Sequence, residues 1–260
     1  MKKALLKSII FMFVILSIVA CGTEDGGKET TSKDETKGDK EILTMVTAAE
    51  FPPFETRNEA GEIIGFDIDL ANMIAEELGM ELQIEDMKFD GIIGSLQAGR
   101  ADMAIAGMNA TEERKQNVEF SKDYYSDGQI FISQPDSEIK SLEDLKGKTV
   151  GVQLGSIQAE GAEKLAKEYD FEVKTLDDVG IVVQEILSNR VDIGYMDKAV
   201  AEGYIESQDL VGFTDPTESA PGMAVAFPKD SELVDKVNDI ITELEENGEI
   251  AKLEEKWLSE

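Results

Sequence analysis

Residues 96–114 read LQAGRADMAIAGMNATEER, and several features of an α/β fold follow one another in this segment. Gly99 marks the end of a helix. The apolar run Met103–Ala106 is short and uninterrupted, which is typical of a strand buried on both faces. A polar turn, residues 107–111, follows this strand, and we expect a short helix to begin at Thr111.

The same order of elements recurs later in the chain. Residues 186–197, ILSNRVDIGYMD, repeat the helix end, the turn with Arg-x-Asp and the buried strand. We expect strands at 42–46, 63–66, 80–84, 150–152, 172–176 and 191–196, and helices at 70–78, 91–98, 159–169, 179–187, 233–244 and after Gly248. Asp67 or Asp69 is expected to cap the first helix. This alternation predicts an α/β fold with functional sites at the carboxyl ends of strands.

The composition excludes several kinds of function. The chain has 260 residues, with 55 Asp and Glu against 25 Lys and Arg, no His and one Cys. A catalytic triad that needs His, a His-ligated metal and an intrachain disulfide are therefore excluded. A formal charge of -30 argues against nucleic acid, because a polyanion is bound by clustered Lys and Arg. No Gly-rich phosphate loop or metal-spaced acid cluster is present, so we expect no cofactor, no metal and no catalytic residue.

The first residues are typical of a secretory signal. Lysines precede the apolar run Ser8–Ala20, which is too short for a transmembrane helix. The run ends at Cys21, and this junction resembles the lipobox of bacterial lipoproteins, in which the cysteine is lipidated. An ordinary signal peptide with an incidental Cys is the alternative. We therefore expect a signal peptide at 1–20, lipidation at Cys21, a flexible tether at 21–40 and an extracytoplasmic protein anchored to the cell membrane.

Two strand ends carry polar groups that suit a zwitterion. In the first half, the N–H groups after the polar turn and the Arg114 guanidinium suit a carboxylate, although Arg114 could be a surface residue. In the second half, the segment 153–158 runs from a strand into a helix start and could hold the same anion. Asp197 ends another strand and is either an ammonium partner or a helix N-cap. An anion site that faces a carboxylate is complementary to an α-amino acid.

Two aromatic residues lie on loops next to these strand ends. Phe51 is in a loop that two prolines stiffen, and Phe89 precedes a helix. Aromatic side chains in such positions can clamp a ligand, but they are also common in the core.

Motifs along the chain resemble those of the polar amino-acid-binding proteins of ABC importers, the bacterial extracellular solute-binding family 3. The motifs are EFPPFE at 50–55, GFDIDL at 65–70, FDGII at 89–93, AGMNATEERK at 106–115, LEDLKG at 142–147, VQLGS at 152–156 and FPK at 227–229. They cover nearly all of residues 41–260 in order.

The resemblance implies a two-lobed fold of the periplasmic-binding-protein type, with ligand enclosed between the lobes. Lobe 1 would be 41–125 plus 222–260 and lobe 2 would be 129–219, joined by hinges near 124–128 and 220–222. The partners implied are a free amino acid and an ABC transporter permease, and we expect a monomer.

The resemblance also assigns roles to single residues. Phe51 and Phe89 would pack on the ligand side chain, and Asp197 would bind its ammonium group. The remaining contacts to the ligand's carboxylate and ammonium groups would come from Gly107, Asn109, Arg114, Ser156, Ile157 and Gln158. Asn109 and Ile157 depart from the family pattern, which usually has a hydroxyl residue there.

The charged residues near the expected pocket indicate which kind of ligand side chain fits there. Glu50, Asp90 and Glu160 lie near the pocket segments and no spare Arg or Lys does, which favours a cationic or neutral polar amino acid over glutamate or aspartate. Two alternatives share the architecture, namely an enzyme similar to cyclohexadienyl dehydratase and an amino-acid sensor domain. The enzyme would need an acid or base in the cleft, and the sensor a following transmembrane segment.

Overall fold

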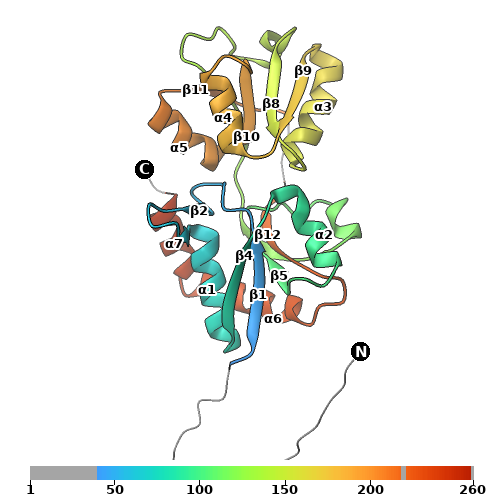
Figure 1. Ribbon diagram of the computed structural model, residues 1–260, viewed down its shortest axis with the longest axis vertical. Helices are drawn as coiled ribbons and strands as arrows, with labels where there is room; N and C mark the ends of the chain where they lie inside the picture. Colours follow the sequence, from blue (N-terminus) through green and yellow to red (C-terminus); the bar gives the residue numbers. More distant parts are fainter. Residues whose placement is uncertain (1–39, 218–220, 259–260) are drawn as a thin grey trace, which may run out of the picture. The chain divides into compact units, whose positions relative to one another are not determined.

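Two five-stranded sheets, each with its own helices, form the fold. The computed structural model describes residues 40–217 and 221–258 (Figure 1). The predicted signal peptide, the lipidation at Cys21 and all of the tether except Lys40 lie outside these residues. Among the described residues, no helix combines the length and the apolar character that a membrane span needs.

The first sheet, with its helices, is here called lobe 1. Its strand order is β4-β1-β5-β12-β6. The strands are β1 (Ile42–Thr47), β4 (Glu81–Asp86), β5 (Met103–Ala104), β6 (Glu119–Tyr125) and β12 (Met223–Phe227). The helices are α1 (Phe66–Leu78), α2 (Ile92–Gln97), α6 (Leu233–Glu246) and α7 (Glu249–Trp257). Strands β1, β4 and β5 are parallel, whereas β12 runs antiparallel to β5 and β6.

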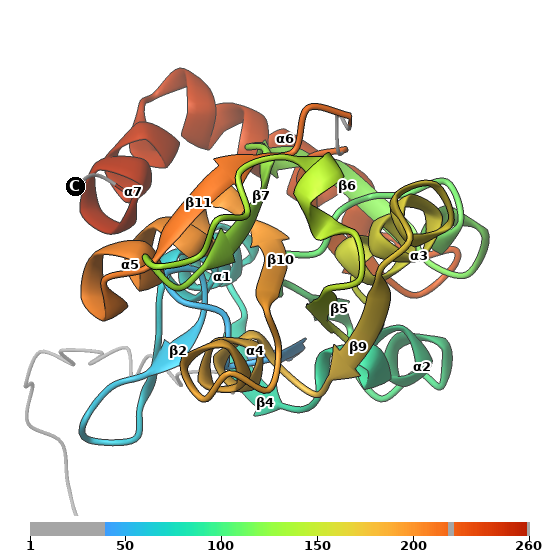
Figure 2. The same cartoon turned by 90° about the horizontal axis from the view of Figure 1, so that it is seen from above.

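The second sheet, with its helices, is called lobe 2. Its strand order is β11-β7-β10-β8-β9, and Figure 2 shows β11, β7 and β10 side by side. The strands are β7 (Gln129–Ser133), β8 (Thr149–Gln153), β9 (Glu172–Leu176), β10 (Ile193–Asp197) and β11 (Val211–Thr214). The helices are α3 (Ile157–Tyr169), α4 (Val179–Leu187) and α5 (Lys198–Gln208). The prediction of an α/β fold is confirmed, with antiparallel strands added to each sheet.

Short elements complete the described chain. A small hairpin is formed by β2 (Thr56–Arg57) and β3 (Ile63–Ile64). Single 3₁₀ turns lie at Phe89–Gly91, Arg114–Gln116 and Leu142–Leu145. The prediction of a helix that begins at Thr111 is therefore wrong, because only the 3₁₀ turn at Arg114–Gln116 forms there.

Alternating side chains bury both faces of the lobe 1 sheet. Leu43 and Met45 of β1 pack in one cluster with Ile74 of α1, whereas Val46 joins Leu96 of α2 in another. This is the period of two that a strand requires, because successive side chains point to opposite faces. Burying each such side chain contributes about 1.5–3 kcal/mol.

The lobe 2 sheet is covered in the same way, and one glycine is essential to it. Val152 of β8 packs with Ala162 of α3, while α4 covers the opposite face. A Cβ at Gly194 in β10 would lie 2.8 Å from Cδ1 of Ile186 and 2.9 Å from Cγ1 of Val182. Glycine at this position allows α4 to lie directly against the strand.

The chain crosses between the sheets after β6 and again after β11, since β7 and β12 belong to the opposite sheet. Asp127, in the first crossing, accepts a hydrogen bond from the Ala199 N–H (2.6 Å) and so caps the start of α5. The predicted lobe boundaries, with hinges near 124–128 and 220–222, remain predictions about which residues move together.

Candidate ligand-binding site

All of the predicted ligand-binding residues line one cavity at the facing ends of the two sheets. The lining residues are Ala48, Phe51, Glu55, Phe89, Ala106, Gly107, Asn109, Arg114, Gln153, Ser156, Ile157, Gln158 and Asp197. The cavity volume is about 10 Å³, roughly the room of one water molecule. An amino acid can therefore enter only when the lobes move apart, so the structure represents a closed arrangement.

Arg114 is buried and reaches from lobe 1 to lobe 2. Its Nη1 donates to the carbonyl of Asn109 (2.9 Å) and its Nη2 to the carbonyl of Gly155 in lobe 2 (3.0 Å). Its Cζ lies 5.4 Å from the ring centroid of Phe89, a cation–π contact. Burial lowers the pKa of Arg114, and the negative charges of Glu160 and Asp197 partly offset this lowering. Arg114 is thus a cleft residue rather than a surface residue, and its donors can turn to an anion.

Asp197 lies at the end of β10 in lobe 2. Its Oδ1 accepts a hydrogen bond from Gln129 (3.0 Å) and its Oδ2 accepts one from Gln158 (2.7 Å). Although Asp197 is at the N-cap position of α5, its side chain makes no capping hydrogen bond. Burial and then the charge of Asp127 raise the pKa of Asp197 to about 7. Neutral amides hold this carboxyl group, and a cation placed next to it would stabilise its ionised form.

The start of α3 supplies backbone N–H groups to the lobe 2 side of the cavity. Ser156 is the N-cap, and its Oγ accepts from the Ala159 N–H (3.1 Å) and donates to the Gln153 carbonyl (2.7 Å). Ile157 and Gln158, the next residues, line the cavity. The N-terminus of a helix carries a partial positive charge and unpaired N–H groups, which suits a carboxylate.

In lobe 1, the ring of Phe51 packs directly against the backbone of Gly107, where a larger residue would not fit. Gly107 has φ 56°, and a Cβ there would lie 2.6 Å from Cε1 of the Phe51 ring. The ring of Phe51 also stacks on Phe54 at 5.8 Å between centroids. Asn109 donates its side-chain amide to the Pro221 carbonyl (2.9 Å), which ties this loop to the second crossing segment. Phe51 and Phe89 therefore have both a packing role and a place at the cavity wall.

Glu55 and Asp67 were not predicted for the site, although both lie in the recognised motifs. Asp67 does not cap α1, which begins with Gly65 at its N-cap and no capping side chain. Instead its Oδ2 accepts from the Gly107 N–H (2.8 Å) and the Tyr124 hydroxyl (2.9 Å). Glu55 is fully buried and lines the cavity. An acidic residue inside an apolar motif was the available signal for both.

Two further contacts join the lobes at the cavity rim. Lys88 of lobe 1 contacts Glu50 (2.5 Å) in its own lobe and Asp178 of lobe 2 (3.3 Å). A Cβ at Gly155 of lobe 2 would lie 3.2 Å from Cβ of Asp90. Charge pairing and close packing therefore both join the lobes at this rim.

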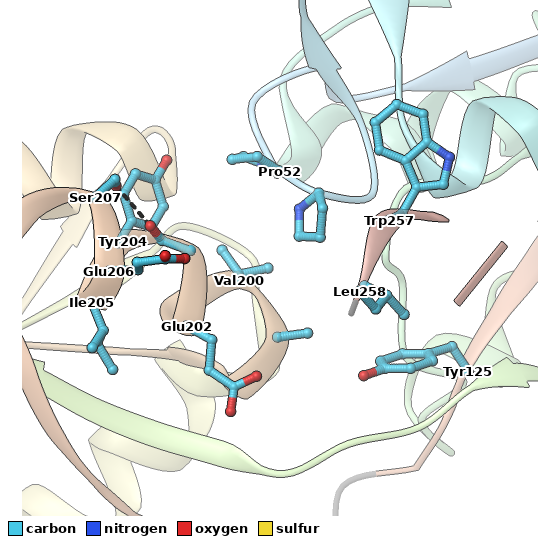
Figure 3. A pocket seen from close by; sticks show the side chains of 13 residues that line it. Pro52, Tyr125, Val200, Glu202, Tyr204, Ile205, Glu206, Ser207, Trp257 and Leu258 are labelled. Atoms are coloured by element: carbon cyan, nitrogen blue, oxygen red, sulfur yellow. Dashed lines mark hydrogen bonds between the residues drawn. The ribbon is translucent and has the colours of Figure 1, made fainter. Parts of the chain in front are cut away.

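A larger groove, of about 660 Å³, lies beside α5 (Figure 3). Its walls include Tyr125 and Trp257 from lobe 1 and Glu202 and Glu206 from lobe 2. It contains none of the predicted ligand-binding residues, and no Arg or Lys is among the residues that line it. Its Glu202 is already paired with Lys198 (3.4 Å). The smaller cavity, whose lining includes both Arg114 and Asp197, is therefore the better candidate.

Two α/β lobes that close on a cavity with opposite charges define a solute-binding protein. The family model of bacterial extracellular solute-binding proteins, family 3, matches residues 43–260. The arginine-binding extracellular protein ArtP of Bacillus subtilis (strain 168) is 42% identical over 262 residues, covering 100% of this chain and 99% of that protein. The chain therefore belongs to the bacterial extracellular solute-binding proteins, family 3.

Solved structures agree with this assignment. An ancestral arginine-binding protein bound to arginine superposes with a TM-score of 0.80 and 41% identity, covering 85% of this chain and 100% of that one. An ancestral amino acid-binding protein, described as a precursor of cyclohexadienyl dehydratase, has a TM-score of 0.79 and 33% identity, covering 84% and 96%. Both of these relatives are amino acid-binding proteins.

Proposed function

We propose that this protein captures a cationic amino acid, arginine foremost, between its lobes and presents it to an ABC transporter. The observation that carries the proposal is that a buried guanidinium from lobe 1, Arg114, and a buried carboxylate from lobe 2, Asp197, line the same cavity. Each is held by neutral groups that a ligand can replace.

The α-carboxylate of the ligand is assigned to groups from both lobes and the α-ammonium to lobe 2. The carboxylate takes the Arg114 donors and the N–H groups at the start of α3, and the ammonium takes Asp197. Only the closed arrangement completes both sets, so the ligand favours closure by its differential affinity for the closed state. Phe51 and Phe89 form the walls for the side chain.

The balance of charge supports a cationic side chain. The cavity wall carries the carboxyl groups of Glu55 and Asp197 and a single guanidinium, Arg114. A zwitterion adds no net charge, whereas arginine or lysine adds one positive charge. Relatives whose names include arginine support the same preference.

A thermal-shift screen with the twenty amino acids and cystine tests this function. Arginine or lysine is expected to raise the melting temperature most, because a ligand at 100 times its Kd adds about 2.7 kcal/mol of stability. A shift with glutamate or aspartate and none with arginine, lysine or glutamine would show that the assigned ligand class is wrong.

The enzyme alternative rests on the likeness to the dehydratase precursor. A binding protein returns its ligand unchanged, so arginine incubated with an equimolar amount of protein is expected to give the same NMR spectrum after days. Appearance of a new product would favour the enzyme.

We also propose that the mature protein begins at lipidated Cys21, is held at the outer face of the cell membrane and acts as a monomer. The apolar run before Cys21 supports the lipidation. Metabolic labelling with a radioactive fatty acid should mark the wild-type protein and not Cys21→Ala. Light scattering of the protein from residue 41 onward should give the monomer mass.

A further inference from the structure

Glu55, in the cavity wall, has a second buried carboxyl group, Asp67, next to it, and the proposed function assigns neither of them a contact to the ligand. Glu55 is 0% exposed, and within the described part of the chain neither of its carboxyl oxygens has a hydrogen-bond donor. Asp67 is also 0% exposed, and its Oδ1 likewise lacks a donor. Its Oδ2 is occupied by the Gly107 N–H and the Tyr124 hydroxyl. Three buried acceptor atoms on two carboxyl groups therefore have no hydrogen-bond donor among the described residues.

The charged groups around Glu55 increase the imbalance. They are Asp67 of α1, Asp197 at the end of β10 and Asp86 at the end of β4, all acidic. The cation nearest in sequence, Arg57, is bound to Asp86 (2.7 Å) and to the Gly61 carbonyl (2.8 Å).

The other groups packed against this pair supply no compensating charge. Tyr124, from β6, donates its hydroxyl to Asp67. Arg114 is occupied by two carbonyls. Two neighbouring carboxylates without a cation cannot both remain ionised at low cost.

One proton satisfies two of the three acceptors. A proton on Glu55 can be donated to Oδ1 of Asp67, which removes one charge and gives both atoms a partner. The second oxygen of Glu55 then remains without a donor, and Glu55 lines the cavity. A ligand bound in this cavity can supply an N–H donor at this wall.

We propose that Glu55 and Asp67 share one proton before the ligand binds, and that the other oxygen of Glu55 accepts a hydrogen bond from a cationic nitrogen of the bound amino acid, whereupon the shared proton passes to solvent. The O–H bond of the carboxyl group breaks, the ligand nitrogen keeps its own protons, and Glu55 becomes the carboxylate partner of that nitrogen. This inference rests on the proposed function.

The direction of the pKa values agrees with this geometry. Burial, and next the charge of Asp67, hold the pKa of Glu55 well above its usual value. Burial raises the pKa of Asp67 to about 6. A ligand cation stabilises the ionised form, so arginine should bind more tightly as the pH rises and should release protons as it binds.

Calorimetry in buffers of different ionisation enthalpy measures this proton release. The variant Glu55→Gln keeps the shape of the side chain, and its amide can donate to Asp67 permanently. With arginine at pH 6.5, wild type is expected to release more protons than Glu55→Gln, and the variant to bind about tenfold more weakly. Asp197 titrates in both proteins, so the difference between them reports Glu55. Glu112→Gln, an exposed residue paired with Lys115, is the control and should match wild type.

The outcomes separate the two proposals. If wild type binds no amino acid, the proposed function fails. If wild type binds arginine but Glu55→Gln, folded by its denaturation curve, shows the same proton release and affinity, only the role of Glu55 is overturned. The same comparison with citrulline, whose side chain is neutral, locates the contact. If wild type still releases more protons than Glu55→Gln, Glu55 contacts the α-ammonium group of the ligand. If the two proteins release the same number of protons, Glu55 contacts the guanidinium of arginine.

Discussion

At the scale of single residues, the site depends on charges that the folded protein has already removed from water. Asp197 and Arg114 are both more than nine-tenths buried, and amides or carbonyls hold them in the closed arrangement. A ligand that brings the opposite charges exchanges these neutral partners for charged ones, which are about twice as strong. Most of the affinity should therefore come from very few side chains.

The first prediction concerns Asp197→Asn. The variant removes the negative charge, while the amides of Gln129 and Gln158 can turn to pair with the new group. Loss of the ammonium partner should cost roughly 2–5 kcal/mol of binding free energy, a drop in arginine affinity of more than about thirtyfold. Titration calorimetry measures it, and an undiminished affinity would show that Asp197 does not bind the ligand.

The residues of the cleft could be predicted from the sequence where they directly follow a strand or belong to a motif. Arg114 and Asp197 are of this kind. Glu55 and Asp67 lie in motifs but were not predicted for the site, because their importance depends on contacts with distant parts of the chain. Asp67 contacts Gly107, 40 positions away, and Tyr124, 57 positions away. A local pattern assigns such an acid to the nearest helix cap.

At the scale of elements, the strands and helices with clear periodicity were predicted and the crossing strands were not. The α4, α6 and α7 helices lie where the apolar spacing placed them. The crossing strands β7 and β12 are buried along their whole length and show no alternation. Strand β12 pairs with β6, where Met223 lies opposite Tyr125, almost a hundred residues earlier. Such pairing depends on the tertiary fold rather than on local sequence.

The second prediction tests how closely the loop before α3 must approach lobe 1. Gly155 has φ 77°, and its substitution by Ala would place a Cβ 3.2 Å from Cβ of Asp90 in the other lobe. Gly147 is a matched control, because it has φ 69° and a Cβ added there would have no atom within 4 Å. Both alanine variants should lose about 1 kcal/mol of unfolding free energy from the strained backbone.

Only Gly155→Ala should also bind arginine more weakly, by a factor of about three to ten. The reason is that the added methyl group resists closure and leaves the open protein unaffected. Denaturation curves and titrations of the two variants give the comparison. Equal affinity of both variants would mean that the lobes do not need this close contact.

At the scale of the whole molecule, buried carboxyl groups link stability to pH. Burial raises the pKa of Asp197 to about 7. Burial also raises the pKa of Asp67 and that of Asp127 to about 6. In the unfolded chain these groups titrate near their ordinary value of 3.8. Between these values the folded protein binds more protons than the unfolded one, so stability is lost as the pH rises.

The third prediction follows from that sign. Without ligand, the unfolding free energy should be highest near pH 4 and fall as the pH rises to 7. Asp197→Asn should flatten the upper part of this dependence, because its contribution is removed. Urea denaturation across this range measures the slope. A stability that rises from pH 4 to 7 would contradict the raised pKa values of these buried groups.

The central claim is that one ligand bridges two lobes through its two opposite charges. Calorimetric titration of the wild-type protein with arginine, agmatine and 5-guanidinopentanoate tests this most directly, because agmatine lacks the carboxylate and 5-guanidinopentanoate lacks the ammonium group. We predict that arginine binds and that each analogue binds at least a hundredfold more weakly, about 2.7 kcal/mol. An analogue that binds as tightly as arginine would contradict the claim.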